Sequence, residues 1–249
     1  MTNEGARERR NLSELLVGPE SGSRSARLPS HAASRRPRPT KRPRMSELDR
    51  FLLRWIGEQH TARLDVIAQL LGREEAVTQR RARAITQRWK AMGLARSAEM
   101  IARVPSFVWL TGHGMTAAGL TYPVHRPHFS TLAHHHTVAL TRLAIERTAL
   151  GHHWMSERAI ALAASRYQHI PDGVYLDQQE RDVAVEVELT RKSAARLRGI
   201  IGELAGDYSR IVYVTDSRAI ATAVTDAAGS IGVTDRLTIT SLSELSPPR

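Results

Sequence analysis

Apolar residues recur every three or four positions from about residue 45 onward, a spacing that predicts amphipathic helices. The first predicted helix covers residues 46–58, and its apolar positions are Leu48, Phe51, Leu52, Trp55 and Ile56. A second is predicted over RLDVIAQLL, residues 63–71, with Thr61 as its N-cap and Gly72 as a left-handed C-terminal cap. A third covers EEAVTQRRARAITQRWKAM, residues 74–92, and ends at Gly93. The sequence therefore predicts three consecutive helices between residues 46 and 92.

The third predicted helix has a polar stripe opposite its apolar side. Its apolar residues are Val77, Ile85, Trp89 and Met92, and its stripe consists of Arg80, Arg83, Gln87 and Lys90. Two short extended segments, LARSAEM and SFVWLT, follow Gly93 and are predicted to pair as a hairpin. Three helices and a hairpin are the element order of a winged helix-turn-helix, whose third helix enters the major groove of DNA. We therefore predict a domain over residues 45–120 that binds double-stranded DNA; the alternatives are a merely solvated helix face or a homodimer interface.

The second half of the chain alternates between helical and extended patterns. Two prolines mark residues 121–130 as a linker, and a long helix is predicted over residues 131–150. Further helices are predicted over RAIALAAS and over residues 191–205 and 218–228, and extended segments over HWMSE, residues 170–176 and 183–189, IVYVT and LTITSL. The pattern predicts a mixed α/β domain over residues 131–246, so that the fold class is α/β, or α+β over the whole chain.

Charge is concentrated in the first half of the chain. Residues 1–44 carry 11 Lys and Arg against 4 acids, and residues 45–120 carry 11 against 7, whereas the remainder is balanced. This excess favours a polyanionic partner such as nucleic acid. Residues 1–44 are rich in Arg, Ser and Pro, and we expect a disordered basic arm there, either contacting DNA or an unselected tail, or sequence upstream of a start at Met45.

Several functional classes are disfavoured by composition. The chain has no cysteine, which fits a cytoplasmic location and excludes thiolate metal sites. No apolar run approaches the roughly 20 residues that span a bilayer, so no membrane partner is expected. The stretch GHGMTAAG lacks the Lys-Ser/Thr ending of a phosphate loop, and no nucleotide cofactor is expected.

Acidic residues interrupt the apolar strand VAVEVEL at residues 183–189. Side chains on a strand repeat every second residue, so Glu186 and Glu188 point to the same face. Asp172 opens the preceding extended segment and is expected near them. Buried carboxylates are tolerated only when they are solvated, protonated or bound to a cation.

This arrangement resembles the PD-(D/E)xK nuclease core, with Pro171 and Asp172 followed by an acid-x-charged triplet at residues 186–188. The resemblance implies that Asp172 and Glu186 bind Mg²⁺ together with an upstream acid, for which Glu157 is preferred to Glu146. The superfamily's lysine is replaced here by Glu188, and Lys192 is a candidate for a displaced lysine. Glu188 and Lys192 are thus the candidate catalytic residues, and the alternative is a catalytically inactive domain.

A longer resemblance extends from about residue 48 to residue 240. The segments WMSER, HIPDGV, VAVEVELTRKS and IVYVTDS look like those of the replication-relaxation family of actinobacterial plasmids and integrative elements. The resemblance implies a role in plasmid or mobile-element replication or DNA relaxation. Two hypotheses follow: a Mg²⁺-dependent DNA-nicking enzyme, or a non-catalytic DNA-binding regulator or relaxosome accessory.

Histidines are clustered at residues 125–136 and 152–153, which suggests a transition-metal site. Consecutive helical residues point about 100° apart, so His134, His135 and His136 cannot place all three rings on one ion. The tyrosines invite a tyrosine-linked relaxase, but no His-x-His motif accompanies them, and packing roles are expected.

Overall fold

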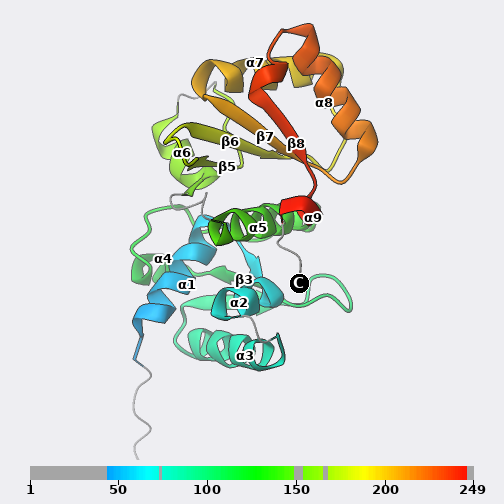
Figure 1. Cartoon of the computed structure of the whole chain (residues 1–249). Helices are drawn as coiled ribbons and strands as arrows, with labels where there is room; N and C mark the ends of the chain where they lie inside the picture. Colours follow the sequence, from blue (N-terminus) through cyan, green and yellow to red (C-terminus); the bar gives the residue numbers. More distant parts are fainter. Residues whose placement is uncertain (1–43, 73–74, 149–153, 165–167, 246–249) are drawn as a thin grey trace, which may run out of the picture. The chain divides into compact units, whose positions relative to one another are not determined.

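The computed structural model describes residues 44–72, 75–148, 154–164 and 168–245. These residues belong to one compact unit that contains two sheets flanked by helices (Figure 1). The mixed α/β class predicted from the pattern is confirmed. The predicted basic arm at residues 1–44 lies outside the described residues, apart from Arg44.

The first sheet is built by the first half of the described chain. Its elements are α1 (Glu47–Glu58), β1 (Ala62–Arg63), α2 (Leu64–Leu71), α3 (Glu75–Ala91), β2 (Ala95–Ala98), β3 (Phe107–Leu110) and α4 (Gly112–Ala117). The three strands are antiparallel in the order β1-β3-β2, with Ala62 opposite Val108 and Ala95 opposite Leu110. The predicted hairpin is the β2–β3 pair.

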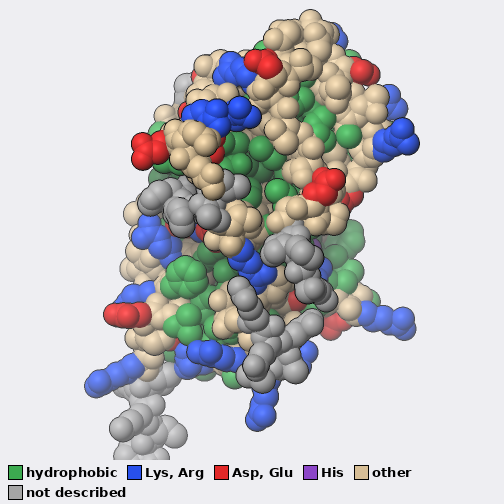
Figure 2. Space-filling view, viewed as in Figure 1, with side chains coloured by type: hydrophobic (Ala, Val, Ile, Leu, Met, Phe, Trp, Pro, Cys, Tyr) green, Lys and Arg blue, Asp and Glu red, His purple; other side chains and the backbone are tan. Residues whose placement is uncertain are grey.

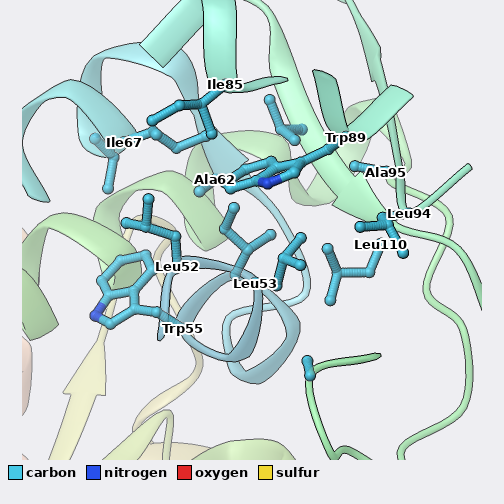
Figure 3. Packing of buried hydrophobic residues seen from close by; sticks show 14 of the residues in the cluster. Leu52, Leu53, Trp55, Ala62, Ile67, Ile85, Trp89, Leu94, Ala95 and Leu110 are labelled. Atoms are coloured by element: carbon cyan, nitrogen blue, oxygen red, sulfur yellow. The ribbon is translucent and has the colours of Figure 1, made fainter. Parts of the chain in front are cut away.

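Apolar side chains from three helices and the sheet form the core of this half (Figure 3). Trp89 of α3 is fully buried and packs in one cluster with Leu53 of α1 and Ile67 of α2. Phe51 was predicted on this face but is 52% exposed. The buried face of α1 includes Leu53, and a residue two positions away lies about 200° around the helix.

Asp49 is a buried carboxylate that ties α1 to α3. Its oxygens accept hydrogen bonds from the backbone nitrogen of Ser46 at 2.8 Å, as part of a capping box, and from Trp89 Nε1 at 2.8 Å. Arg88 completes the set with an ion pair. Burial alone would raise the pKa of Asp49, but the hydrogen bonds from Ser46, Trp89 and Arg88 outweigh burial and hold this pKa below its usual value.

Two local predictions in the first half are wrong, and one helix was not predicted. Thr61 does not cap α2; Arg63 is the N-cap residue, and Thr61 Oγ1 instead donates to the Val108 carbonyl at 2.9 Å. Gly72 follows α2 with φ 153° and ψ −174°, which differs from a left-handed helical cap. The stretch GHGMTAAG contributes α4, a short helix capped by Thr111 that the pattern did not predict.

The second half of the described chain builds a five-stranded sheet. Its elements are η1 (Phe129–Thr131), α5 (Leu132–Arg147), β4 (Met155–Ser156), α6 (Glu157–Ala163), β5 (Gly173–Leu176), β6 (Asp182–Val187), α7 (Ala194–Asp207), β7 (Arg210–Val214), α8 (Arg218–Ser230), η2 (Thr234–Arg236), β8 (Leu237–Thr240) and α9 (Leu242–Leu245). The strand order is β4-β5-β6-β7-β8. The first three strands are antiparallel, whereas β6, β7 and β8 run parallel through the crossover helices α7 and α8.

Both faces of the central strand β6 are covered. Ala184 packs in a cluster with residues of α7 and α8, whereas Val185 and Val187 pack with Val138 of α5. Helix α5 also contributes Ala139 to the core of the first half. This double coverage makes β6 apolar in general and makes acids on it exceptional.

Two buried arginines connect α1 to α5 and α6. Arg142 of α5 pairs with Glu58 of α1 at 2.9 Å and stacks on Trp55, 4.8 Å from its centroid. Arg158 of α6 donates to the Gly57 carbonyl at 2.6 Å and to the Pro123 carbonyl. These contacts set the end of α1 beside the start of α6. Among the described residues, none of the helices combines the length and apolarity needed to cross a bilayer.

We expect Asp49→Asn to lower the free energy of unfolding by about 2–3 kcal/mol, because both oxygens of this buried carboxylate accept hydrogen bonds and an amide nitrogen cannot. The pKa of Asp49 in the folded protein lies below its unfolded value of about 3.9. The stability that ionised Asp49 contributes to the wild type is therefore complete above pH about 3.9 and is lost as pH falls through the folded pKa. Urea unfolding at several pH values measures both effects. The matched variant Asp65→Asn breaks a pair with Arg63 in which both side chains are 22% exposed, and it should cost about 1 kcal/mol, because solvent screens this pair more than the buried Asp49. Equal losses in the two variants would contradict the role given to Asp49.

Candidate functional site

Asp172 joins the start of β5 to the end of β6. Its Oδ2 accepts from the backbone nitrogen of Val187 at 2.7 Å, and its Oδ1 lies 2.8 Å from His134 Nε2. The next residue is Gly173, where a Cβ atom would lie 1.9 Å from the Trp154 ring. The carboxylate is therefore oriented by the backbone of a neighbouring strand, and its side chain is only 12% exposed.

Glu186 is buried on β6, with 5% of its surface exposed. Its Oε1 lies 2.7 Å from His169 Nε2. Burial, to which the charge of Asp172 adds, raises the pKa of Glu186 to about 7, against the opposing effect of His169. Asp172 and Glu186, predicted from the sequence to converge, thus lie close enough for their charges to interact.

Glu188 follows β6 and is 3% exposed. It forms an ion pair with Lys192, and its Oε1 accepts from the backbone nitrogen of Thr190 at 3.3 Å. The charge of Lys192 also acts to lower the pKa of Glu186, so its ammonium group lies near both acids. Tyr213 is opposite Glu186 on β7, and its buried hydroxyl has no hydrogen-bond partner among the described residues.

The two candidate upstream acids differ in their contacts. Glu146 accepts from Trp55 Nε1 at 2.8 Å and from Arg142 Nε at 2.6 Å, so it belongs to the connection between α1 and α5. Glu157 is the first residue of α6, and its backbone nitrogen donates to the Asp172 carbonyl at 3.4 Å. Its carboxylate lies 3.2 Å from His60 Nε2, a bond that lowers the pKa of Glu157.

His134 lies among three of these acids. Burial lowers the pKa of His134, but the hydrogen bond and charge of Asp172, together with Glu157 and Glu186, raise it above the usual value. Each of the four acids therefore has a basic partner: Glu157 with His60, Asp172 with His134, Glu186 with His169 and Glu188 with Lys192. Among the described residues, no three His, Asp or Glu side chains are arranged as they stand to hold a metal ion.

A second group of histidines lies beside Glu157. The rings of His60, His125 and His135 are mutually close, with centroid separations of 4.7, 4.9 and 5.1 Å. Burial and the neighbouring imidazoles, with Arg158 acting on His125, lower the pKa of His125 to about 4 and that of His135 to about 3. Both rings are consequently neutral at pH 7.

The basic stripe of α3 lies on the surface of the first half. Arg80, Arg83, Gln87 and Lys90 are all exposed, and Figure 2 shows Lys and Arg side chains projecting from the part of the molecule where Figure 1 labels α1 and α3. An open pocket of about 460 Å³ adjoins the end of α3 and is lined partly by Lys90, Arg96 and Trp109. This pocket lies apart from the four acids.

No family model, curated protein or solved structure matches this chain.

The sequence predicted the acids and Lys192 but not the histidine partners of the other three acids. His60, His134 and His169 are each far from their acid along the chain, so no local motif connects them. The excess of histidine near residue 130 was the available signal, and it was discounted because the consecutive rings diverge. His152 and His153 lie outside the described residues.

We expect Asp172→Asn to lower the pKa of His134 below its usual 6.5, because burial then acts with less opposition. An NMR titration of the ring protons, without added metal, measures the change. The raised pKa in the wild type also implies a stabilising contribution that is complete below pH about 6.5 and lost as pH rises through the folded pKa. Asp177→Asn, in the β5–β6 turn where Asp177 pairs with Arg181, is the control. An unchanged His134 pKa in Asp172→Asn would contradict the assigned pairing.

Proposed function

We propose that the protein binds double-stranded DNA through a winged helix-turn-helix at its first sheet. Support comes from the element order of helix, strand, two helices and hairpin, and from the sheet order β1-β3-β2. Helix α3 is the recognition helix, and its exposed stripe of Arg80, Arg83, Gln87 and Lys90 contacts phosphates and base edges. The concentration of positive charge in residues 1–120 supports the same partner.

The second sheet carries a Mg²⁺-dependent DNA-nicking site in this proposal. The observation that carries it is the approach of Asp172 and Glu186 from neighbouring strands, with their charges acting on each other. Further support comes from the topology, in which three antiparallel strands are followed by a crossover helix and a parallel strand, as expected for a PD-(D/E)xK core.

The residues fit a magnesium ion held by two carboxylates. Mg²⁺ prefers oxygen ligands and is commonly bound by one or two carboxylates together with substrate phosphates. Burial and the charge of Asp172 raise the pKa of Glu186 to about 7, and a bound cation would oppose both effects by favouring the ionised carboxylate. Asp172 and Glu186 would hold the ion, and Glu157 would join them only by leaving His60. Bound there, Mg²⁺ would activate a water molecule and neutralise charge on the phosphate.

The chain's own residues position the other participants. The Val187 amide fixes the orientation of Asp172, so that one acid is preorganised whatever its charge state. Lys192, paired with Glu188 and near Glu186, supplies the positive charge that the superfamily places two residues after the first strand acid, where this chain has Glu188. Glu188 or Lys192 accepts the proton of the attacking water as the general base.

The resemblance to the replication-relaxation family supports a role for this activity in plasmid or mobile-element DNA processing. Relaxation of supercoiled DNA requires at least a transient nick, and a metal-dependent nuclease supplies one. A homodimer would present two such sites to the duplex.

A second candidate function is a non-catalytic DNA-binding regulator or relaxosome accessory. The observation that favours it is the pairing of every acid with histidine or lysine, which neutralises the cluster without an ion. In that case the second sheet serves as a docking platform, and cleavage is absent under all metal conditions.

We expect Arg83→Ala or Lys90→Ala to weaken binding to duplex DNA and to lower the salt slope by about one if the lost side chain contacts a phosphate. Fluorescence anisotropy over a range of salt concentrations measures both quantities. Arg198→Ala, an equally exposed arginine on α7, is the matched control and should leave both unchanged. Unchanged affinity and slope in the α3 variants would remove α3 from the interface.

We expect the purified protein to nick supercoiled plasmid with Mg²⁺ or Mn²⁺ but not with EDTA. The double variant Asp172→Asn, Glu186→Gln should lose the activity because the ion then has no charged ligand at this site. The control Glu180→Gln changes an exposed acid in the β5–β6 turn and should cleave normally. Nicking that persists in the double variant would refute the site, and no nicking by any form would favour the regulator.

A further inference from the structure

The three-histidine cluster, defined as His60, His125 and His135, belongs to no step of the proposed nuclease. We propose that it is a binding site for a transition-metal ion such as Zn²⁺, with three imidazole ligands and one open position. The three residues come from the turn after α1, from the loop before η1 and from α5, so the ion would join separate segments of the fold.

The spacing of the rings matches what such an ion requires. A Zn–N bond of about 2.0–2.1 Å puts each imidazole centre about 3.2 Å from the ion, and tetrahedral ligands then have centres about 5.2 Å apart. The observed separations are 4.7 Å for His60 and His125, 4.9 Å for His60 and His135, and 5.1 Å for His125 and His135. All three pairs are within about 0.5 Å of the tetrahedral spacing.

Each ring also has a buried nitrogen atom to offer. His60 Nδ1, His125 Nε2 and His135 Nδ1 are all buried without a hydrogen-bond partner among the described residues. Buried polar atoms are normally paired, and three unpaired atoms on rings in mutual contact require an explanation. A shared cation satisfies all three at once.

The partner of His60 suits a metal ligand. Its Nε2 lies 3.2 Å from Glu157 Oε2. An ionised carboxylate only accepts hydrogen bonds, so Nε2 carries the proton and Nδ1 keeps a free lone pair. Histidines that bind metals usually donate their other nitrogen to a carboxylate or carbonyl in this way. The backbone of His60 has φ 63°, a left-handed conformation uncommon for a residue other than glycine, and such positions are often functional.

Binding requires the rings to turn. In the described part of the chain no three side chains already enclose an ion position, and the planes of His60 and His135 are only 13° apart. The torsion that rotates an imidazole about its Cβ–Cγ bond has a broad energy profile, so reorientation is inexpensive. The ring centres need not move far, because their separations already suit coordination.

Imidazole ligands select the class of ion. Neutral nitrogen donors favour Zn²⁺, Co²⁺, Ni²⁺ and Cu²⁺, whereas Mg²⁺ prefers oxygen. The cluster therefore differs in metal preference from Asp172 and Glu186. The inference does not depend on the nuclease proposal, and either can fail alone.

The test measures metal retention by the full-length chain without a polyhistidine tag. After treatment with a chelator and dialysis, Zn²⁺ is added, excess is removed by gel filtration, and metal per chain is measured by atomic emission. Co²⁺ is the spectroscopic probe, because a four-coordinate site gives intense visible bands. The variants are His60→Asn, which tolerates the left-handed backbone, His125→Ala in the loop, and His135→Gln.

The control variant is His136→Gln, the neighbour of His135 on the same helix, whose ring lies near Arg63 and Asp65 instead. We expect wild type, His136→Gln and the Asp172→Asn, Glu186→Gln double variant to retain one equivalent of Zn²⁺. Each cluster variant should bind Zn²⁺ more than about 100-fold less tightly, since losing only the hydrogen-bond partner of a metal ligand costs about 10–100-fold in metal affinity.

Three results would overturn the proposal: no retained Zn²⁺ or Co²⁺ in the wild type, wild-type affinity in the cluster variants, or equal loss in His136→Gln. Circular dichroism checks that each variant is folded. If a variant unfolds, X-ray absorption of the zinc-loaded wild type decides, because fewer than three imidazole ligands would contradict the assignment.

Discussion

The buried guanidinium groups of Arg142 and Arg158 constrain the position of every functional group around the end of α1. Arginine cannot lose its proton inside a protein, so each group must be surrounded by acceptors or by an aromatic face. Arg142 finds Glu58, Glu146 and the ring of Trp55, and Arg158 finds two backbone carbonyls. The contacts of both arginines can form only when α1, α5 and α6 pack in this one arrangement. This packing of the three helices brings His60 to Glu157. The geometry of the three-histidine cluster therefore depends on the contacts of Arg142 and Arg158.

The acidic strand is compatible with its apolar surroundings because negative charge is compensated locally. A carboxylate buried in a covered sheet would normally be protonated or expelled. Here imidazoles from α5 and from the segment before β5 approach Asp172 and Glu186, and Lys192 approaches Glu188. Imidazole is an adaptable partner because it changes charge near neutral pH. A change in the charge of one of these acids can therefore be matched by a change in the charge of its imidazole partner.

Periodicity predicted the order of helices and strands well because each long element buries one face. The apolar spacing of α1, α3 and α5 and the continuous run in β6 were sufficient signals. Elements too short to show a period were missed: β1 has two residues, and α4 has six. Capping was wrong at Thr61 because a tertiary acceptor, the Val108 carbonyl, competed for its hydroxyl. Glu186 and Glu188 could be found from their alternation on one strand, whereas His134 is 38 residues from Asp172 and His169 is 17 residues from Glu186, so that no local spacing pairs them. The identification of DNA and Mg²⁺ as partners remains a prediction.

The absence of a side chain at Gly173 affects the orientation of the preceding residue, Asp172. Any side chain there would overlap the indole of Trp154, because even the first carbon would lie 1.9 Å from the ring. Displacing the indole would shift the strand pairing between β4 and β5, where Ser156 lies opposite Gly173. Asp172 is held by the same stretch of backbone. Asp172 can therefore keep its orientation only with glycine at position 173, unless the position of Trp154 also changes.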